Sequence, residues 1–180
     1  ALDKATGERV WASEPVGAAH YASPLLITVD GVEQVVIVNK SGATAFDPAT
    51  GKKLWNFGGW TCRISIPNVT HVGDGKVVIT GGYGAGTVMI QVARAGGKWS
   101  TKQLWRNDEI NSQMNPALLW DGHLYFNSNS NERSDGLTCT DLDGKILWRT
   151  GKSPNFERGH MLLVDGMLYM SSTSADNGMY

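Results

Sequence analysis

The sequence has no large excess of positive or negative charge and no long hydrophobic run, and each absence argues against one class of function. Its 180 residues carry 16 Lys and Arg against 17 Asp and Glu, a formal net charge of −1. Proteins that bind a nucleic-acid backbone generally carry a basic patch, so nucleic acid is not expected as a partner. Apolar stretches such as 35–38 and 161–164 run only four residues. A helix needs about 20 to cross a bilayer, so no membrane span is expected in this segment.

The sequence also lacks paired cysteines and a helical repeat of apolar residues. Cys62 and Cys139 are far apart and form no Cys-x-x-Cys pair, so we expect two small buried or half-buried side chains. No stretch sustains an apolar spacing of about 3.6 residues, so almost no helix is predicted. Glycine, at 22 residues, and tryptophan, at 7, are abundant instead. This composition favours short strands joined by tight turns.

An internal repeat is the main feature of the sequence. Residues 1–11 return as 45–55, and a shorter version returns as 140–148. The tryptophans that close these copies, together with a looser copy, are 44, 50 and 43 residues apart, at positions 11, 55, 105 and 148. Asp-Gly pairs that begin at positions 30, 74, 121 and 165 run in step, spaced by 44, 47 and 44. Because the tryptophans and the Asp-Gly pairs recur with nearly the same period, they indicate a genuine internal repeat.

Each unit of the repeat reads as four short strands. In one unit, apolar or β-branched runs at 24–29, 34–39, 43–47 and 52–57 are separated by turn residues. A later unit repeats the pattern at 117–120, 123–127, 137–141 and 145–149. The Asp-Gly pairs supply the positive φ angles that tight hairpins need. The glycine-rich run at 81–86 matches no phosphate-binding motif, and we interpret it as a wide hairpin between a second and a third strand.

A repeated four-stranded antiparallel unit of about 40–45 residues is typical of a β-propeller blade. We therefore predict an all-β propeller segment, with about four blades present. The approximate repeats are 1–22 (partial), 23–65, 66–114, 115–158 and 159–180 (partial). A closed four-blade ring is one arrangement. We favour part of a larger ring of about six to eight blades, because the sequence opens inside a repeat. The closing tryptophans are expected to fill the gaps between blades.

The pattern Ala-x-Asp-x-x-Thr-Gly-x-x-x-Trp at 1–11 and 45–55 resembles the repeat of the PQQ-like (quinoprotein) β-propellers. That superfamily includes PQQ-dependent alcohol dehydrogenases and a non-catalytic lipoprotein of the outer-membrane assembly machinery. The segments 81–86 and 131–137 resemble uncharacterised bacterial PQQ-binding-like repeat proteins. The resemblance implies a propeller fold and a periplasmic or secreted location, whereas its motif is structural and carries no activity.

A PQQ-dependent dehydrogenase, as the resemblance implies, needs PQQ, a calcium ion held by several oxygen ligands, a general base and usually adjacent cysteines. The two cysteines here lie in different repeats. Most aspartates are explained by turns. These are Asp3, Asp30, Asp47, Asp74, Asp121, Asp141, Asp143 and Asp165. Asp108, Asp135 and Asp176 remain, and no spacing ties them together. No catalytic or metal-binding residue is therefore predicted in this segment.

Three polar loops, 106–115, 127–133 and 155–158, are longer than a turn requires. Binding residues concentrate on loops that a rigid scaffold carries. Solvated surface loops remain the simpler interpretation, and a recognition face is the alternative. Its candidate residues are His20, Arg63, Gln113, Asn115, Glu132, Arg133, Arg158 and His160.

The leading functional hypothesis is a non-catalytic binding or scaffold module that presents polar loops to a protein, peptide or glycan partner. The alternative is part of a PQQ- and calcium-dependent alcohol or sugar dehydrogenase. A third hypothesis is a structural subunit whose open blade edges pair with further blades or with another chain, because unpaired strand edges are templates for association.

Overall fold

The computed structural model describes residues 1–154, 156–172 and 178–179. These residues form β-strands and connecting segments, and none of them forms a helix. The strands are β1 (Leu25–Val29), β2 (Val32–Asn39), β3 (Gly42–Phe46), β4 (Lys53–Phe57), β5 (Thr70–Gly73), β6 (Lys76–Gly81), β7 (Gly86–Ala95), β8 (Lys98–Asn107), β9 (Leu118–Trp120), β10 (His123–Asn129), β11 (Ser134–Thr140), β12 (Ile146–Arg149), β13 (Met161–Val164) and β14 (Met167–Met170). No helix in the described part of the chain could therefore span a membrane.

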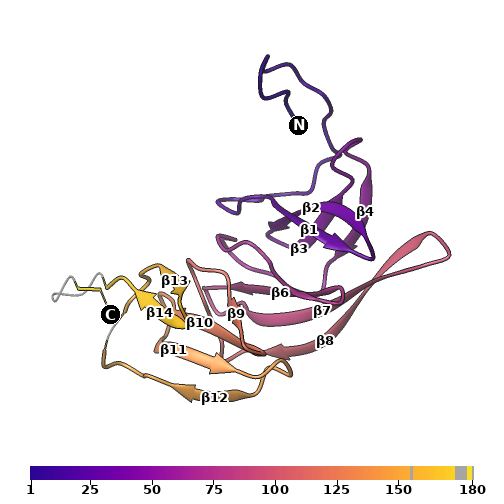
Figure 1. Cartoon of the computed structure of the whole chain (residues 1–180). Helices are drawn as coiled ribbons and strands as arrows, with labels where there is room; N and C mark the ends of the chain where they lie inside the picture. Colours follow the sequence, from indigo (N-terminus) through magenta and orange to yellow (C-terminus); the bar gives the residue numbers. More distant parts are fainter. Residues whose placement is uncertain (155, 173–177, 180) are drawn as a thin grey trace.

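The strands build three four-stranded sheets and one hairpin. The sheet orders are β1-β2-β3-β4, β5-β6-β7-β8 and β9-β10-β11-β12, and β13 pairs with β14. Every pairing is antiparallel between neighbours in sequence. We call the three sheets blades 1, 2 and 3, and the hairpin the partial blade. Figure 1 shows them in succession, from the N-terminal segment at the top to the partial blade at the left. The predicted all-β propeller segment is confirmed.

The Asp-Gly pairs form the first turn of each blade, as predicted. Both residues of each pair have positive φ, which is the geometry of a type I′ hairpin turn. The φ angles are 48° and 71° at Asp30-Gly31, 48° and 70° at Asp74-Gly75, 45° and 71° at Asp121-Gly122, and 50° and 73° at Asp165-Gly166. Residues 82–85 likewise form the expected loop between β6 and β7.

Apolar side chains fill the spaces between successive blades. Alternate residues of a strand point to opposite faces, so each blade contributes one face to the preceding interface and the other to the following one. In β6, Val77 and Ile79 pack towards blade 1, whereas Val78 packs towards Leu124 and Phe126 of blade 3. Each of these side chains is at most 1% exposed. Blade stacking, and not any single sheet, therefore supplies the core.

The closing tryptophans join neighbouring blades. Trp11, which precedes blade 1, donates its indole N–H to the carbonyl oxygen of Pro48 at 2.9 Å. Its ring lies where a Cβ on Gly51 would come within 2.4 Å of it. Trp105 of blade 2 lies in the same way over Gly144 of blade 3, where a Cβ would come within 2.7 Å. A tryptophan of one blade thus covers the β3–β4-type turn of the next, which confirms its predicted packing role for these two positions.

The other two closing tryptophans differ. Trp55 is buried between blades 1 and 2, and its indole N–H donates to Gln34 Oε1 at 2.5 Å. Trp148 of blade 3 is 44% exposed and lies 6.2 Å from the ring of Tyr125 in its own blade. Trp55 does not cover a turn of blade 2, because the turn between β7 and β8 lies at the end of longer strands.

Blade 2 departs from the repeat in one element. Strands β7 and β8 have ten residues each, whereas β3 and β4 of blade 1 have five each. The hairpin closes through Gly96 and Gly97, with φ of 57° and 79°, between the paired residues Ala95 and Lys98. This hairpin, which we call the arm, extends away from the other strands at the right of Figure 1.

Candidate functional site

The polar loops lie at one end of the blades. Because all strands are antiparallel, the links between blades and the loops between second and third strands share one end, whereas the Asp-Gly turns lie at the other. We call the shared end the loop face. It consists of residues 40–41, 58–69, 82–85, 108–117, 130–133 and 150–160, with residue 155 outside the described part.

A path of contacts runs across the loop face from blade to blade. The guanidinium of Arg63 lies over the ring of Tyr83, 5.8 Å from its centroid. Gln113 donates its amide N–H to the Tyr83 hydroxyl at 3.3 Å and accepts the backbone N–H of Asn131 at 2.9 Å. Arg158 donates to the side-chain oxygen of Asn131. Three of the predicted residues, one from each link between blades, therefore contact the loop between the second and third strands of an adjoining blade.

Asn115 belongs to a buried amide cluster below this path. It is 4% exposed and donates to the carbonyl oxygen of Gly159 at 2.8 Å. Asn127 donates to the same oxygen at 2.8 Å and accepts from Asn129, also at 2.8 Å. Gly159 itself packs against Ser171 of the partial blade, because a Cβ there would lie 1.6 Å from the carbonyl oxygen of Ser171. Asn115 thus joins blade 3 to the partial blade, and its side chain does not reach the surface.

Glu132 and Arg133 lie at the tip of the β10–β11 loop. The Glu132 carboxylate accepts the hydroxyl of Ser130 at 3.0 Å. Burial raises the pKa of the Cys62 thiol, and the Glu132 charge adds a smaller contribution. Arg133 forms an ion pair with Asp135 at 2.7 Å. Both charged side chains are thus engaged with neighbours within their own loop and strand.

The two predicted histidines lie apart from that path. His20 is exposed and has a φ of 43°, and its Nδ1 lies 3.3 Å from the hydroxyl of Ser65. His160 is exposed, and its backbone N–H donates to the Ser171 hydroxyl at 2.9 Å. Neither imidazole forms an ion pair with an acidic side chain among the described residues.

A small polar pocket opens beside Arg158. Its volume is about 260 Å³, and it is lined by Asn129, Ser130, Asn131, Ser134, Glu157 and Arg158. Amide, hydroxyl and charged groups of both signs converge there. Such a lining suits hydrogen bonding to a polar peptide or sugar group.

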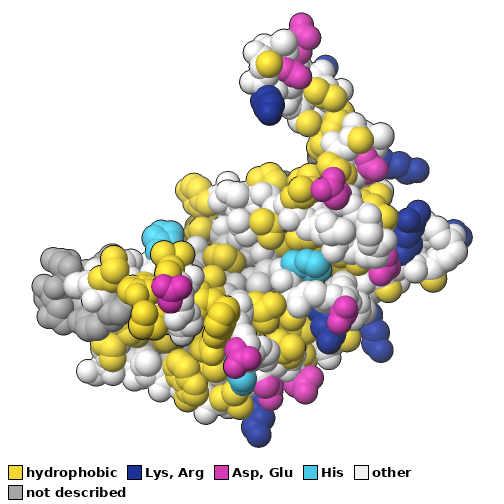
Figure 2. Space-filling view, in the orientation of Figure 1, with side chains coloured by type: hydrophobic (Ala, Val, Ile, Leu, Met, Phe, Trp, Pro, Cys, Tyr) yellow, Lys and Arg dark blue, Asp and Glu magenta, His cyan; other side chains and the backbone are white. Residues whose placement is uncertain are grey.

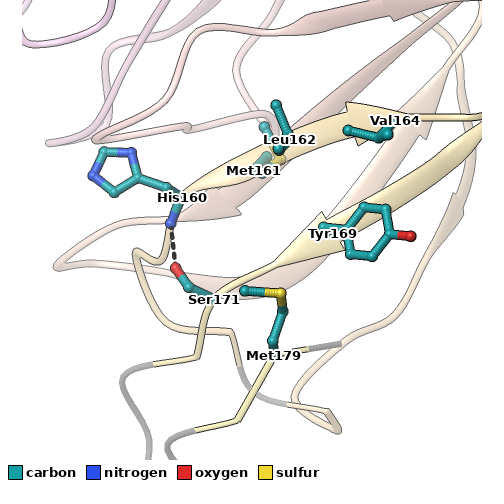
Figure 3. A pocket seen from close by; sticks show the side chains of 7 residues that line it. All are labelled: His160, Met161, Leu162, Val164, Tyr169, Ser171 and Met179. Carbon is teal, nitrogen blue, oxygen red and sulfur yellow. Dashed lines mark hydrogen bonds between the residues drawn. The ribbon is translucent and has the colours of Figure 1, made fainter.

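A second pocket is almost wholly apolar and lies on the partial blade (Figure 3). Its volume is about 350 Å³, and it is lined by His160, Met161, Leu162, Val164, Tyr169, Ser171 and Met179. Counted from the Asp-Gly pair, Leu162 and Tyr169 correspond to Ile27 and Gln34, which face blade 2 in blade 1. Leu162 is nevertheless 61% exposed. The pocket is therefore part of a blade-packing surface.

The described residues do not fit the calcium ion that a PQQ-dependent dehydrogenase would need. No three His, Cys, Asp or Glu side chains in this part of the chain lie close enough together to hold a metal ion. Asp108 is paired with Arg106 at 2.6 Å, and Asp135 is paired with Arg133. Asp176 and the predicted loop residue Asn155 lie outside the described residues. No reaction step can be derived from this donor set.

Sequence reasoning missed Tyr83, which links two predicted residues. Tyr83 has a φ of 59° within the glycine-rich loop 82–85. Positive φ is uncommon for a bulky residue, and a lone tyrosine among glycines was the available signal. Its partners are 20 and 30 residues away in sequence, at Arg63 and Gln113, so the contact itself was not readable from spacing.

The sheets, their turns and the tryptophans between blades define an arc of a β-propeller made of PQQ-like repeats. Residues 1–150 match the sequence profile of the family described as outer membrane protein assembly factor BamB, and the chain belongs to that family.

Among solved structures, BamB from Moraxella catarrhalis is similar to the chain with a TM-score of 0.60 and 18% sequence identity. The match covers 96% of this chain and 48% of that one, so this chain spans about half of its length. No curated protein sequence matches the chain significantly. The structural likeness supports the propeller fold alone.

Proposed function

We propose that this protein is a non-catalytic binding or scaffold module of the bacterial cell envelope, which presents the loop face to a protein or peptide partner. The observation that supports it most is the contact path from Arg63 to Arg158. In this path the buried Gln113 joins loops of several blades, and those loops carry the exposed side chains of Arg63, Asn131 and Arg158. Rigid scaffolds that hold loops in this way are typical of binding proteins. The family description supports a role in outer-membrane protein assembly, with a periplasmic location.

Site-specific photocrosslinking in the producing bacterium tests this proposal. A photoreactive amino acid is placed at the exposed positions of Arg63, Glu132 and Arg158, one at a time. Matched controls replace Asp121 and Lys145, which are exposed at the opposite end of the blades. We expect the loop-face positions to crosslink to the same protein and the controls not to do so. Equal crosslinking from both ends, or none from the loop face, contradicts the proposal.

The dehydrogenase alternative has its own measurement. PQQ and calcium are titrated into the purified protein while tryptophan fluorescence is followed, and dye-linked alcohol oxidation is then assayed. Saturable, calcium-dependent binding with turnover would replace the scaffold hypothesis. The donor set described above leads us to expect neither.

A further inference from the structure

The arm creates a groove that the regular repeat lacks. Strands β7 and β8 are each ten residues long, so the turn that joins them lies beyond the edge of the sheet. This turn, the tip of the arm, lies beside the start of β4. The arm is held near its tip, because Trp99, which pairs with Arg94 close to the Gly96-Gly97 turn, packs against the core between blades 1 and 2. Thr101 also donates its hydroxyl to the carbonyl oxygen of Asn56 in β4 at 3.2 Å. We call the space between the arm tip and β4 the arm groove.

The arm groove is lined mainly by cations and has two apolar walls. Its volume is about 540 Å³, and its lining is Asp47, Lys52, Lys53, Leu54, Arg94, Gly97, Lys98 and Trp99. Four of these residues are basic and one is acidic, in a chain whose net charge is −1. Figure 2 shows Lys and Arg side chains in dark blue at the right, where the arm projects.

The acidic groups near the groove neutralise only part of this charge. Asp47 accepts hydrogen bonds from Ala49, from the Thr50 backbone and from the Thr50 hydroxyl, at 2.8–3.0 Å. These bonds lower the pKa of its carboxyl, so the group stays ionised. Its Oδ1 atom is already hydrogen-bonded to residues of the same turn. Glu14 forms an ion pair with Lys53 at one side of the groove. A carboxylate from another segment is thus already bound to one of the four cations.

The remaining three cations form no close ion pair. Lys52, Arg94 and Lys98 are absent from the ion pairs of the residues that the structure describes. Hydrogen bonds from Thr50 lower the pKa of Asp47 most, and the charge of Lys52 adds a smaller contribution, whereas neither Arg94 nor Lys98 contributes to it. The guanidinium of Arg94 lies over the Trp99 ring, 5.5 Å from its centroid, which holds it at the wall of the groove. A positioned guanidinium can bind a carboxylate through two parallel hydrogen bonds.

We propose that the arm groove binds an acidic peptide segment of a protein partner. Carboxylates of the segment pair with Lys52, Arg94 and Lys98, and an apolar side chain lies against Trp99 and Leu54. The Glu14–Lys53 pair is the internal precedent for a peptide carboxylate at this place. The groove lies at the end of the blades opposite the loop face, so this interaction is separate from the function proposed above.

The lining favours a peptide over a nucleic acid. Trp99 and Leu54 are half-buried apolar walls, which suit a leucine-sized side chain better than a sugar-phosphate backbone. The protein as a whole also lacks the positive charge that attracts nucleic acids over long distances.

Fluorescence anisotropy with a defined probe tests the proposal. The probe is a short fluorescein-labelled peptide of alternating Glu and Leu, used at an ionic strength of about 0.15 M. The test variant is Lys52→Glu with Lys98→Glu. The control is Lys4→Glu with Lys145→Glu, which makes the same change in net charge at exposed positions outside the groove. Lys145 is the closer match, because it follows Gly144 as Lys52 follows Gly51.

We expect the test variant to bind the probe about tenfold more weakly than the unmodified protein, because two attractive pairs become repulsive. The control variant is expected to keep its affinity, and a peptide of alternating Glu and Ser is expected to bind more weakly than the Glu-Leu probe. An equal loss in both variants overturns the proposal, as does undetectable binding of the probe. Single-stranded oligothymidine that binds as tightly as the peptide and loses affinity in the test variant also overturns it.

Discussion

The packing of Trp105 on the turn of blade 3 predicts that Gly144→Ala costs more stability than an equivalent change beside it. A Cβ on Gly144 would lie 2.7, 2.8 and 2.9 Å from three atoms of the Trp105 ring, and the Gly144 φ is +79°. Gly122, in the same blade, has a φ of +71° and nothing within 4 Å of its Cβ position. Both substitutions pay the same backbone penalty, and only one of them displaces the indole.

The magnitude follows from two contributions. Forcing an alanine into the left-handed region costs about 1–2 kcal/mol at either glycine. Displacing the indole adds an overpacking cost of about 1–3 kcal/mol, which includes weakening of the 2.8 Å bond from the Trp105 indole N–H to the carbonyl oxygen of Leu142. We therefore expect Gly122→Ala to lower the free energy of unfolding by about 1–2 kcal/mol. Gly144→Ala should lower it by about 2–5 kcal/mol.

Urea unfolding followed by far-UV circular dichroism measures both variants. The Trp105→Ala background supplies the second arm of a double-mutant cycle. There Gly144→Ala should cost no more than Gly122→Ala, because the clashing ring is gone. Equal losses for the two glycine variants in the natural background would refute the packing argument. So would a cost of Gly144→Ala that persists unchanged without Trp105.

Further outcomes follow from burial and from the open surface of the partial blade. Burial raises the pKa of the Cys62 and Cys139 thiols, so both should react slowly with a disulfide reagent at pH 8 and quickly once urea is added; fast labelling of the folded protein would contradict this. Burial lowers the pKa of His71, so the unfolded chain binds the proton more readily, and stability should fall as pH drops below 6.5. His71→Gln should flatten that dependence, whereas the exposed His160→Gln should leave it in place; an unchanged slope in His71→Gln counts against the mechanism. The exposed apolar face of the partial blade, on which Leu162 is 61% exposed, should make the 180-residue chain self-associate as its concentration rises. Leu162→Lys places a charge on this face and should reduce the association measured by light scattering; unchanged association would show that this surface is not responsible.

The regular part of the fold was readable from sequence because its determinants are local. An Asp-Gly pair needs only its own backbone to form a type I′ turn, and the turns at Asp30, Asp74, Asp121 and Asp165 all lie where the pattern predicts them. Alternating or continuous apolar runs then gave the strands of blades 1 and 3 to within a few residues. Repetition strengthened both inferences, since each blade tested the interpretation of the others.

The arm and the loop-face contacts were not predicted, for different reasons. The sequence did contain a signal for the arm, because the interval from Trp55 to Trp105 is 50 residues instead of 43 or 44 and contains Gly96-Gly97. The sequence contained no signal for the contact of Gln113 with Tyr83, because this contact depends on how two loops meet after the blades stack. The sequence also grouped Asn115 with the surface candidates. Burial against Gly159 is a property of the folded links between blades and not of the local residues.

The closing tryptophans give the arc a direction. Trp11 and Trp105 each donate to a carbonyl 37 residues further along the chain, so at these two places the tryptophan is held by the blade that follows it. Loss of one blade would release the indole of its predecessor before disturbing its successor. Native-state hydrogen exchange would then show that opening of blade 3 is accompanied by loss of protection around Trp105 of blade 2. At Trp11 and Trp105 the connection between successive units therefore runs in one direction along the chain.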